Sequence, residues 1–458
     1  MRKFDVEPTM LHVWCWSFNT IAENMEEIAK AGFDAIQVSP VQGCEIKRDC
    51  QRCKAEGRQR CVCFKDNWYF QYRPINFKIG NEYLGTRDEF IKMCEIADKF
   101  NVKVIVDVVA NHVTSDMNLV SDDVKNLPNA FHDRGGLYDY NNRYQLTQGN
   151  LFALWDLCTE NHAVQDMISG FLKDCLKCGA WGFRYDSAKH IELPKEVDGE
   201  FGSDFWPNVV GKAEENGAQF QYGEVLQDGY GHEAISRFYE YARYMDVTAT
   251  AYGVKIRQAI RDRNLDSNNI ISYECDENAL SPDRLVTWVE SHDNYANGLN
   301  EWGSSAWMTD DQIKVGWAIV AGRAAGTPLF LSRPVGGGGT EADNRFPEKT
   351  KIGDKGSDLF RAPEVTAVNR FRKAMRGEGE YLRSQGREIL MIERGNKGMV
   401  IVNLSNNKKI DSVTSLCDGT YIDDISGKEF YVQGGNLQGE VENKIAVLVN
   451  KAGHWIVH

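Results

Sequence analysis

The sequence predicts an α/β fold: a (β/α)8 TIM barrel with a small lobe inserted after its third strand and an all-β sandwich domain at its C-terminal end. Three observations predict it. The chain has 458 residues, which exceeds one ordinary domain and suits a barrel with smaller units attached. Short apolar runs rich in β-forming residues alternate with helical patterns over most of the chain. From about Tyr381 onward, short alternating strands are separated by polar turns.

Eight segments have the composition of barrel strands. The most apolar reads VKVIVDV, as expected for a strand that is covered on both faces. Eight such strands fit a closed barrel, and an open doubly wound sheet is the alternative. The expected strands span residues 10–16, 35–38, 102–108, 181–186, 219–224, 245–248, 285–290 and 327–331.

Amphipathic helical patterns lie between these strands. Residues 20–30 (TIAENMEEIAK) form one of them, and Gly32 ends it. Thr86 opens another, which runs to Phe100, and Glu89 three residues later completes a capping box. The rhythm divides the chain into a first barrel segment (1–112), an inserted lobe (113–150), a second barrel segment (151–378) and a C-terminal β domain (379–458).

The charge of the chain limits its partners. The formal net charge of −13 argues against nucleic acid and against anionic membrane surfaces, because phosphates would be repelled. A neutral polymer remains compatible, and we expect a monomer. Asp5, Glu7 and Pro8 interrupt the first residues before any apolar run of the signal-peptide kind. We therefore expect a cytoplasmic protein, or a secreted one if a leader has been removed.

Polar and ionisable residues gather where the expected strands end. In a (β/α)8 barrel, these ends open into one shared pocket. Arg184 and Asp186 are two residues apart on one strand, so both side chains face the same way, and a guanidinium there favours the ionised carboxylate that a nucleophile requires. Glu224 follows the next strand and is placed to act as a proton donor. Two carboxyl groups about 5 Å apart would indicate a retaining glycosidase.

Four segments in this order, DVVANH, GFRYDSAKH, GEVL and ESHDN, resemble the four short motifs of the α-amylase family, glycoside hydrolase family 13. The similarity to bacilli-type members extends over nearly the whole chain. It implies retaining endo-hydrolysis of α-1,4-glucosidic bonds in starch, glycogen or maltodextrins. The alternatives on the same fold are a maltooligosaccharide-acting glucosidase or a transglycosylase. A non-catalytic sugar-binding or transporter-associated member is disfavoured, because all three family carboxylates are present.

The resemblance also implies roles for individual residues. Asp186 matches the nucleophile, Glu224 the general acid/base, and Asp293 the third carboxylate, which binds sugar hydroxyls and supports the transition state. The residues implied to surround the reacting sugar and the leaving group are Tyr72, Asp107, His112, Arg184, Lys189, His190 and His292. Asp107 alone would more often be a structural or sugar-anchoring carboxylate than a group that takes part in the chemistry.

The resemblance implies a calcium ion next to this site and no chloride ion. The implied Ca2+ ligands are the side chains of Asn111 and Asp156 and the main-chain carbonyls of Thr147 and His190, and hard oxygen ligands suit this cation. Chloride-dependent members carry Asn where this chain has Ser291. We therefore expect no activation by chloride.

A cysteine-rich loop is not explained by the resemblance, since the similar proteins have no such cluster there. Cys50-x2-Cys53 is followed by Cys61-x-Cys63, which brings four thiols within reach of one tetrahedral Zn2+ ion. The second half of this spacing is unusual for zinc. Zinc binding, free thiols and disulfides all remain open from the sequence.

Overall fold

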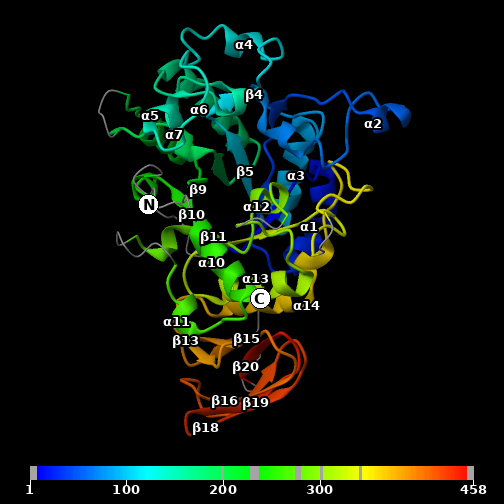
Figure 1. The fold of residues 1–458 in the computed structure, drawn as a ribbon, viewed down its shortest axis with the longest axis vertical. Coiled ribbons are helices and arrows are strands. Elements are labelled where there is room, and N and C mark those ends of the chain that lie inside the picture. Colours follow the sequence, from blue (N-terminus) through cyan, green and yellow to red (C-terminus); the bar gives the residue numbers. More distant parts are fainter. Residues whose placement is uncertain are drawn as a thin grey trace.

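The computed structural model describes residues 8–196, 201–226, 237–273, 280–299, 303–339 and 343–450. In Figure 1 a lobe that carries α4 and α5 lies above the barrel, and an antiparallel β domain lies below it. Among the described helices, none combines the length and the apolar character needed to cross a bilayer.

Eight parallel strands close into a barrel, which confirms the expected fold and excludes the open doubly wound sheet. Each strand lies within or beside its expected segment. Five are shorter than expected: two begin one residue later, two end earlier, and one loses a residue at each end. Around the barrel the strands are β1 (Met10–Val13), β2 (Ala35–Val38), β5 (Lys103–Val109), β8 (Gly182–Asp186), β9 (Phe220–Gly223), β10 (Asp246–Thr248), β11 (Leu285–Trp288) and β12 (Thr327–Leu331).

Long helices alternate with these strands along the chain. The capping box expected at Thr86 and Glu89 is present at the start of α3. The long helices are α1 (Phe18–Lys30), α3 (Arg87–Lys99), α6 (His162–Lys177), α7 (Phe205–Glu215), α10 (Thr250–Arg261), α13 (Asp310–Gly322) and α14 (Pro363–Ala374). Short helices are α2 (Gln51–Ala55), α4 (Asp122–Lys125), α5 (Arg143–Gln148), α9 (Phe238–Tyr241), α11 (Ser267–Ile270) and α12 (His292–Ala296).

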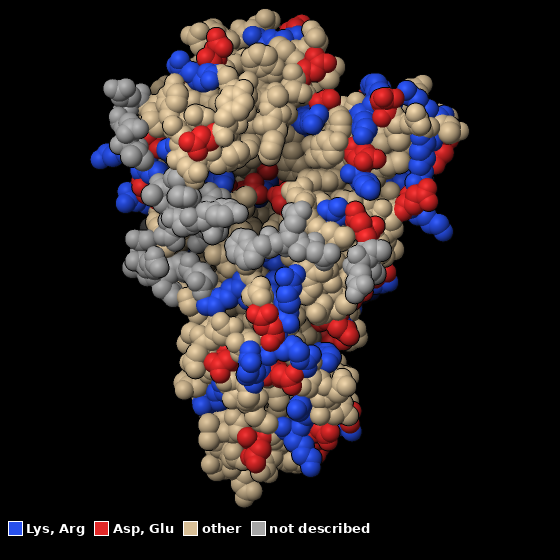
Figure 2. All heavy atoms as spheres, in the orientation of Figure 1, with Lys and Arg blue, Asp and Glu red and all other residues tan. Residues whose placement is uncertain are grey.

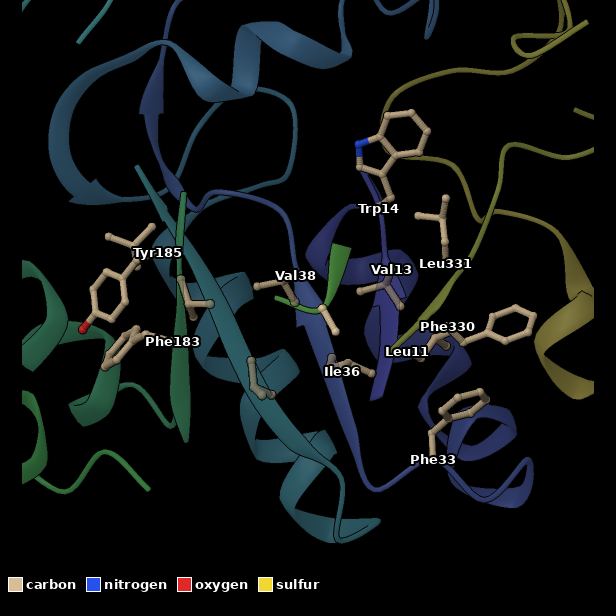
Figure 3. Close-up of a cluster of buried hydrophobic side chains, with 14 of the residues drawn as sticks. Leu11, Val13, Trp14, Phe33, Ile36, Val38, Phe183, Tyr185, Phe330 and Leu331 are labelled. Atoms are coloured by element: carbon tan, nitrogen blue, oxygen red, sulfur yellow. The ribbon is translucent and has the colours of Figure 1, made fainter. Parts of the chain in front are cut away.

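Alternate residues of the barrel strands belong to two different hydrophobic clusters. Leu11 and Ile36 lie in the large cluster between strands and helices, part of which Figure 3 shows. Met10, Ala35 and Ile105 lie in a second cluster that joins residues from strands all around the barrel. Because strands that are far apart around the barrel meet only in its interior, this second cluster is the inside of the barrel. It defines which side chains of each strand point inward.

The chain leaves the barrel after β5 and returns at α6. In this excursion β6 (His112–Val113) pairs with β7 (Trp155–Asp156), with His112 opposite Asp156. A second antiparallel pair, β3 (Gln42–Cys44) with β4 (Pro74–Ile79), precedes it in the chain. The pairing of β6 with β7 brings Asn111 and Asp156 together although they are far apart in sequence.

The C-terminal domain is entirely β-structure, as expected. Its strands form one antiparallel sheet in the order β13-β14-β15-β20-β17-β18-β19-β16. The first and last strands meet where Gln385 Nε2 donates to the Lys409 carbonyl over 2.9 Å, so the sheet folds over its own core like a sandwich. The strands are β13 (Glu380–Gln385), β14 (Ile389–Arg394), β15 (Gly398–Asn403), β16 (Lys408–Val413), β17 (Gly419–Asp423), β18 (Glu429–Gln433), β19 (Asn436–Val441) and β20 (Ile445–Asn450).

Candidate active site

Inward-facing positions at the C-terminal ends of three neighbouring strands carry charged groups. Ile105 lies in the interior cluster, so Asp107, two residues further along β5, faces inward as well. The same alternation directs Arg184 and Asp186 of β8 inward, and Glu224 directly after β9. Gly223 precedes Glu224, and a Cβ there would come within 2.4 Å of Met245 and 2.9 Å of Ala188. Glycine therefore allows these segments to close around the site.

Arg184 holds three carboxylates together. Its Nη1 donates to Asp107 Oδ1 over 2.8 Å and to Asp186 Oδ1 over 2.6 Å. Its Nη2 lies 3.0 Å from Glu224 Oε2. All four groups are buried, so the guanidinium offsets charges that would be costly without a partner. Because Asp186 and Glu224 contact opposite nitrogens of one planar group, their carboxylates lie side by side.

Ser187 connects the same two carboxylates, and the sequence analysis missed it. Its backbone N–H donates to Glu224 Oε2 and its hydroxyl to Asp186 Oδ2, both over 3.0 Å. The residue has a φ of +49°, in the left-handed region that non-glycine residues rarely adopt. Such strain is typical of functional sites. The family motif draws attention to the residues on either side of Ser187 but gives this position no role.

Asp293, at the start of α12, completes the group of carboxylates. Burial raises its pKa well above the ordinary value, and the neighbouring charge of Glu224, with which it shares a hydrogen bond, raises it further. Two carboxyl groups in contact cannot both be ionised without a large electrostatic cost. Both effects favour the protonated form of Asp293. Burial also raises the pKa of Asp107, to about 7, against the opposing effect of the Arg184 charge.

An aromatic wall stands beside these carboxylates. The ring of Tyr72 stacks on His292 at a centroid distance of 5.3 Å and an interplanar angle of 7°. The Tyr72 hydroxyl donates to Asp107 Oδ2 over 3.0 Å, and its main-chain carbonyl lies 3.0 Å from His112 Nε2. Burial, and then the charge of Arg184, lower the pKa of His292 to about 3, so this ring is neutral.

A cleft of about 620 Å³ opens above the carboxylates. Asp107 and Arg184 do not line the cleft and contact its carboxylates from below. The expected site residues that line it are Asp186, Glu224, Asp293, Tyr72, His112, Lys189, His190 and His292. Figure 2 shows a hollow in the middle of this face with acidic atoms inside it. The cleft is therefore negatively charged at its floor and aromatic at one side.

Two aromatic residues at the edge of the cleft were not found from the sequence. Tyr140 and Phe152 line it, and Phe152 is 81% exposed with a φ of +49°. An exposed ring on a strained backbone is unfavourable for stability alone. The sequence offered no signal, because aromatic residues in a polar segment have no motif of their own.

The expected calcium ligands form two pairs: Asn111 contacts Asp156, and His190 contacts the last turn of α5, which contains Thr147. Asn111 Nδ2 donates to Asp156 Oδ1 over 3.0 Å, and both residues are buried. The ring of His190 lies 3.0 Å from the Leu146 carbonyl, which brings this segment against the last turn of α5. Thr147 lies in that turn, where carbonyls have no partner within the helix. The donor set thus offers oxygens of the type that Ca2+ prefers.

His132 contacts Asp156 and was not identified from the sequence. Its Nδ1 lies 2.7 Å from Asp156 Oδ2, and its Nε2 lies 2.8 Å from Glu160 Oε2. Burial opposes its charge, but hydrogen bonds to Asp156, Cys158 and Glu160 raise its pKa to about 12. Burial raises the pKa of Asp156 to about 7. Because His132 faces two acceptors, we assign the charge to its ring and treat Asp156 as its ionised partner.

The four cysteines of the loop converge at one point, away from the cleft. Their sulfur atoms all lie within 4.8 Å of one another. Cys53 and Cys61 are buried, and Cys50 and Cys63 are partly exposed. None of the four is in a disulfide.

Comparisons with known proteins agree with this geometry. A curated α-amylase from Butyrivibrio fibrisolvens is 39% identical over 96% of this chain and 47% of its own length. One from Clostridium acetobutylicum is 36% identical over 96% of this chain and 54% of its own length. The chain thus spans about half the length of these curated relatives. No family model matches it.

Solved structures share the fold at lower identity. A variant of α-amylase I from Eisenia fetida in complex with maltohexaose superposes with a TM-score of 0.76 at 20% identity, covering 96% of this chain and 97% of the other. An Anoxybacillus α-amylase gives a TM-score of 0.71 at 19% identity, covering 98% and 99%. The resemblance predicted from the motifs is confirmed by the curated relatives, and the fold by the structures.

Proposed function

We propose, on the premise that the chain is a homologue of the α-amylases, that it hydrolyses internal α-1,4-glucosidic bonds of glucans such as starch, glycogen or maltodextrins with retention of configuration. The observation that carries the proposal is the contact of one guanidinium with both Asp186 and Glu224. It keeps the two carboxylates close together, and a short separation is the mark of a retaining mechanism.

The reaction proceeds by two displacements. Asp186 attacks the anomeric carbon while the Glu224 carboxylic acid gives its proton to the departing glycosidic oxygen. A covalent glycosyl ester on Asp186 results. Glu224, now ionised, takes a proton from water, and the water oxygen displaces Asp186 from the anomeric carbon.

The surrounding residues hold the reactants in place. Arg184 keeps the Asp186 carboxylate oriented, and its positive charge favours the ionised nucleophile. Asp293 lies at the start of α12 with Asn297 Nδ2 donating to its Oδ1 over 3.1 Å, in a position to bind sugar hydroxyls. Tyr72 and Phe152 offer ring faces in the cleft for sugar stacking. The leaving-group side falls to Lys189 and His190.

We also propose that a calcium ion binds to Asn111, Asp156 and the main-chain carbonyls of Thr147 and His190. The ion would supply positive charge that joins the lobe to the barrel beside His190. Support comes from the contact of Asn111 with Asp156 and from the close packing of His190 against α5. His132 orients the second oxygen of Asp156 in this arrangement.

Product analysis separates the proposal from its alternatives. Starch or a long maltooligosaccharide is incubated with the protein, and early products are separated by chain length. Endo-hydrolysis gives maltooligosaccharides of several lengths from the start. Glucose as the sole early product would support an exo-acting glucosidase, products longer than the substrate would support a transglycosylase, and no product would support a sugar-binding protein.

A further inference from the structure

We propose that Cys50, Cys53, Cys61 and Cys63, here called the cysteine cluster, bind one zinc ion that fixes the wall of the cleft. The cluster sits in the loop that contains α2, which Figure 1 places at the outer edge of the barrel. The role for the wall rests on the proposed glucan hydrolysis; the metal site itself does not.

The distances within the cluster fit a tetrahedral metal site. Ligands at a Zn–S distance of about 2.3 Å lie about 3.8 Å from one another in a tetrahedron. Cys50 and Cys63 have their sulfurs 3.9 Å apart, and Cys53 and Cys63 have theirs 3.6 Å apart. All remaining pairs lie within 4.8 Å.

The same distances argue against disulfides. A disulfide requires about 2.05 Å between two sulfurs and joins them in one pair. The sulfur of Cys63 lies 3.9 Å from that of Cys50 and 3.6 Å from that of Cys53. These two distances are nearly equal, so they favour neither pair as a disulfide. A common centre for four sulfurs explains this convergence, and a covalent pair does not.

The local backbone suits thiolate ligands. Cys50 precedes α2 and Cys53 lies in its first turn. The backbone N–H of Cys53 donates to the Cys50 sulfur, and that of Val62 donates to the Cys53 sulfur over 3.4 Å. Cys61 and Cys63 alternate on an extended segment, so they point to the same side.

The positive charge of the loop also fits a zinc ion bound by four thiolates. Four thiolates around Zn2+ carry a net charge of −2. Residues 45–66 contain seven Lys and Arg against four Asp and Glu, a formal charge of +3 in a chain of −13. Figure 2 shows many basic atoms in the region where Figure 1 places α2. A tetrathiolate centre would therefore be compensated locally.

The loop has few aromatic residues from which to build an apolar core. Between Glu45 and Asp66, Phe64 is the only aromatic residue. Its ring packs against Trp14, directly after β1, at a centroid distance of 4.7 Å. Small units without an apolar core commonly depend on a metal ion for their structure.

The cluster is linked to the cleft by buried hydrogen bonds. Asn67, which is fully buried, donates from Nδ2 to the Cys61 carbonyl over 2.7 Å. Its Oδ1 accepts from the Tyr83 hydroxyl over 2.8 Å. Asn67 directly precedes the short helix Trp68–Tyr72, and both end residues of that helix line the cleft. A metal ion that fixes Cys61 therefore fixes the position of Trp68 and Tyr72.

Metal analysis tests the site directly. The protein is purified without chelator, and its metal content is measured by mass spectrometry. We expect about one zinc per chain in the wild type and in Cys417→Ser, a control at an exposed cysteine of the C-terminal domain. We expect less than a fifth of that content in the double variant Cys50→Ser with Cys53→Ser. Zinc retained by the double variant, no metal in the wild type, or iron in place of zinc would each overturn the proposal.

Replacement of the metal in the wild-type protein avoids any dependence on folding of the variant. Zinc is removed and Co2+ is added, and the visible absorption spectrum is recorded. Four thiolates predict intense sulfur-to-cobalt charge transfer together with the bands of tetrahedral Co2+. A spectrum of six-coordinate Co2+ without charge transfer would contradict thiolate ligation. Neither this readout nor the zinc content requires glucan hydrolysis.

The role for the wall is tested with Asn67→Ala at saturating calcium. We expect this variant to keep its zinc and to show a KM for maltooligosaccharides about 5- to 10-fold higher, with kcat changed less than twofold. A KM equal to that of the wild type would refute the link. If the wild type hydrolyses no glucan, the metal assignment can still stand or fall on zinc content and the cobalt spectrum.

Discussion

Replacing Arg184 by methionine removes the positive charge on which three buried carboxylates depend. Methionine retains much of the side-chain length and leaves Asp107, Asp186 and Glu224 without their contacts of 2.8, 2.6 and 3.0 Å. Loss of one partner from a buried ion pair costs about 3–5 kcal/mol of stability. We also expect kcat/KM to fall about 10²- to 10³-fold, as for loss of a preorganised electrostatic group.

The stability loss should depend on pH, and its sign follows from Asp107. Burial raises the pKa of this residue from its ordinary value of 3.8 to about 7 in the folded protein. The folded protein therefore loses stability as the pH rises from the ordinary pKa to the raised one. The charge of Arg184 opposes the increase. Without it the folded pKa rises further, by about 1–3 units. At pH about 9 this adds about 1–3 kcal/mol to the destabilisation, and at pH about 5 it adds almost nothing.

Thermal unfolding of wild type and variant at pH 5 and pH 9 measures this difference. We expect the gap in Tm between the two proteins to widen by a few degrees at the higher pH. Arg87→Met is the matched control, because Arg87 pairs with Asp174 at the surface, at 2.7 Å. Such a pair contributes at most about 1 kcal/mol, and Asp174 remains ionised throughout this range. An equal gap for Arg184→Met at both pH values would refute the reasoning.

Three further predictions concern the cleft. Asp186→Asn should lower kcat by roughly three or more orders of magnitude with Tm and calcium binding retained, and an active variant would exclude Asp186 as the nucleophile. Phe152→Ala should raise the KM for maltooligosaccharides about fivefold, since a stacking contact contributes about 1 kcal/mol. Tm should stay unchanged because the ring is 81% exposed. An unchanged KM would exclude a role of this ring in sugar binding. With Ser291 in the fourth motif, activity should be the same in chloride and in acetate, and activation by chloride would contradict this.

The barrel and its carboxylates could be predicted because they follow from local rules. Strands buried on both faces are almost purely apolar, and a two-residue repeat places Arg184 and Asp186 on one side. The order of four motifs then identified Glu224, directly after β9, and Asp293, at the start of α12. Glu290, at the end of another strand, shows the limit of this rule, because Arg333 binds both of its oxygens at 2.7 Å and keeps it out of the cleft.

Residues that act through long-range contacts could not be predicted. Ser187 contacts both Glu224 and Asp186 from a left-handed backbone conformation, which the sequence does not signal. His132 meets Asp156 across 24 positions of sequence, although it is the only histidine between residues 113 and 150, which could have served as a signal. The link from Cys61 through Asn67 to Trp68 likewise requires the folded loop. The cytoplasmic location and the monomeric state stay predictions.

The configuration of the first product tests the central claim most directly. Hydrolysis of a maltooligosaccharide is followed by proton NMR during the first minutes, before the new reducing end mutarotates. If Asp186 forms a covalent glycosyl ester that water then displaces with help from Glu224, the new reducing end appears first as the α-anomer. Initial appearance of the β-anomer would show a single displacement by water and would contradict the assignment of Asp186 as the nucleophile.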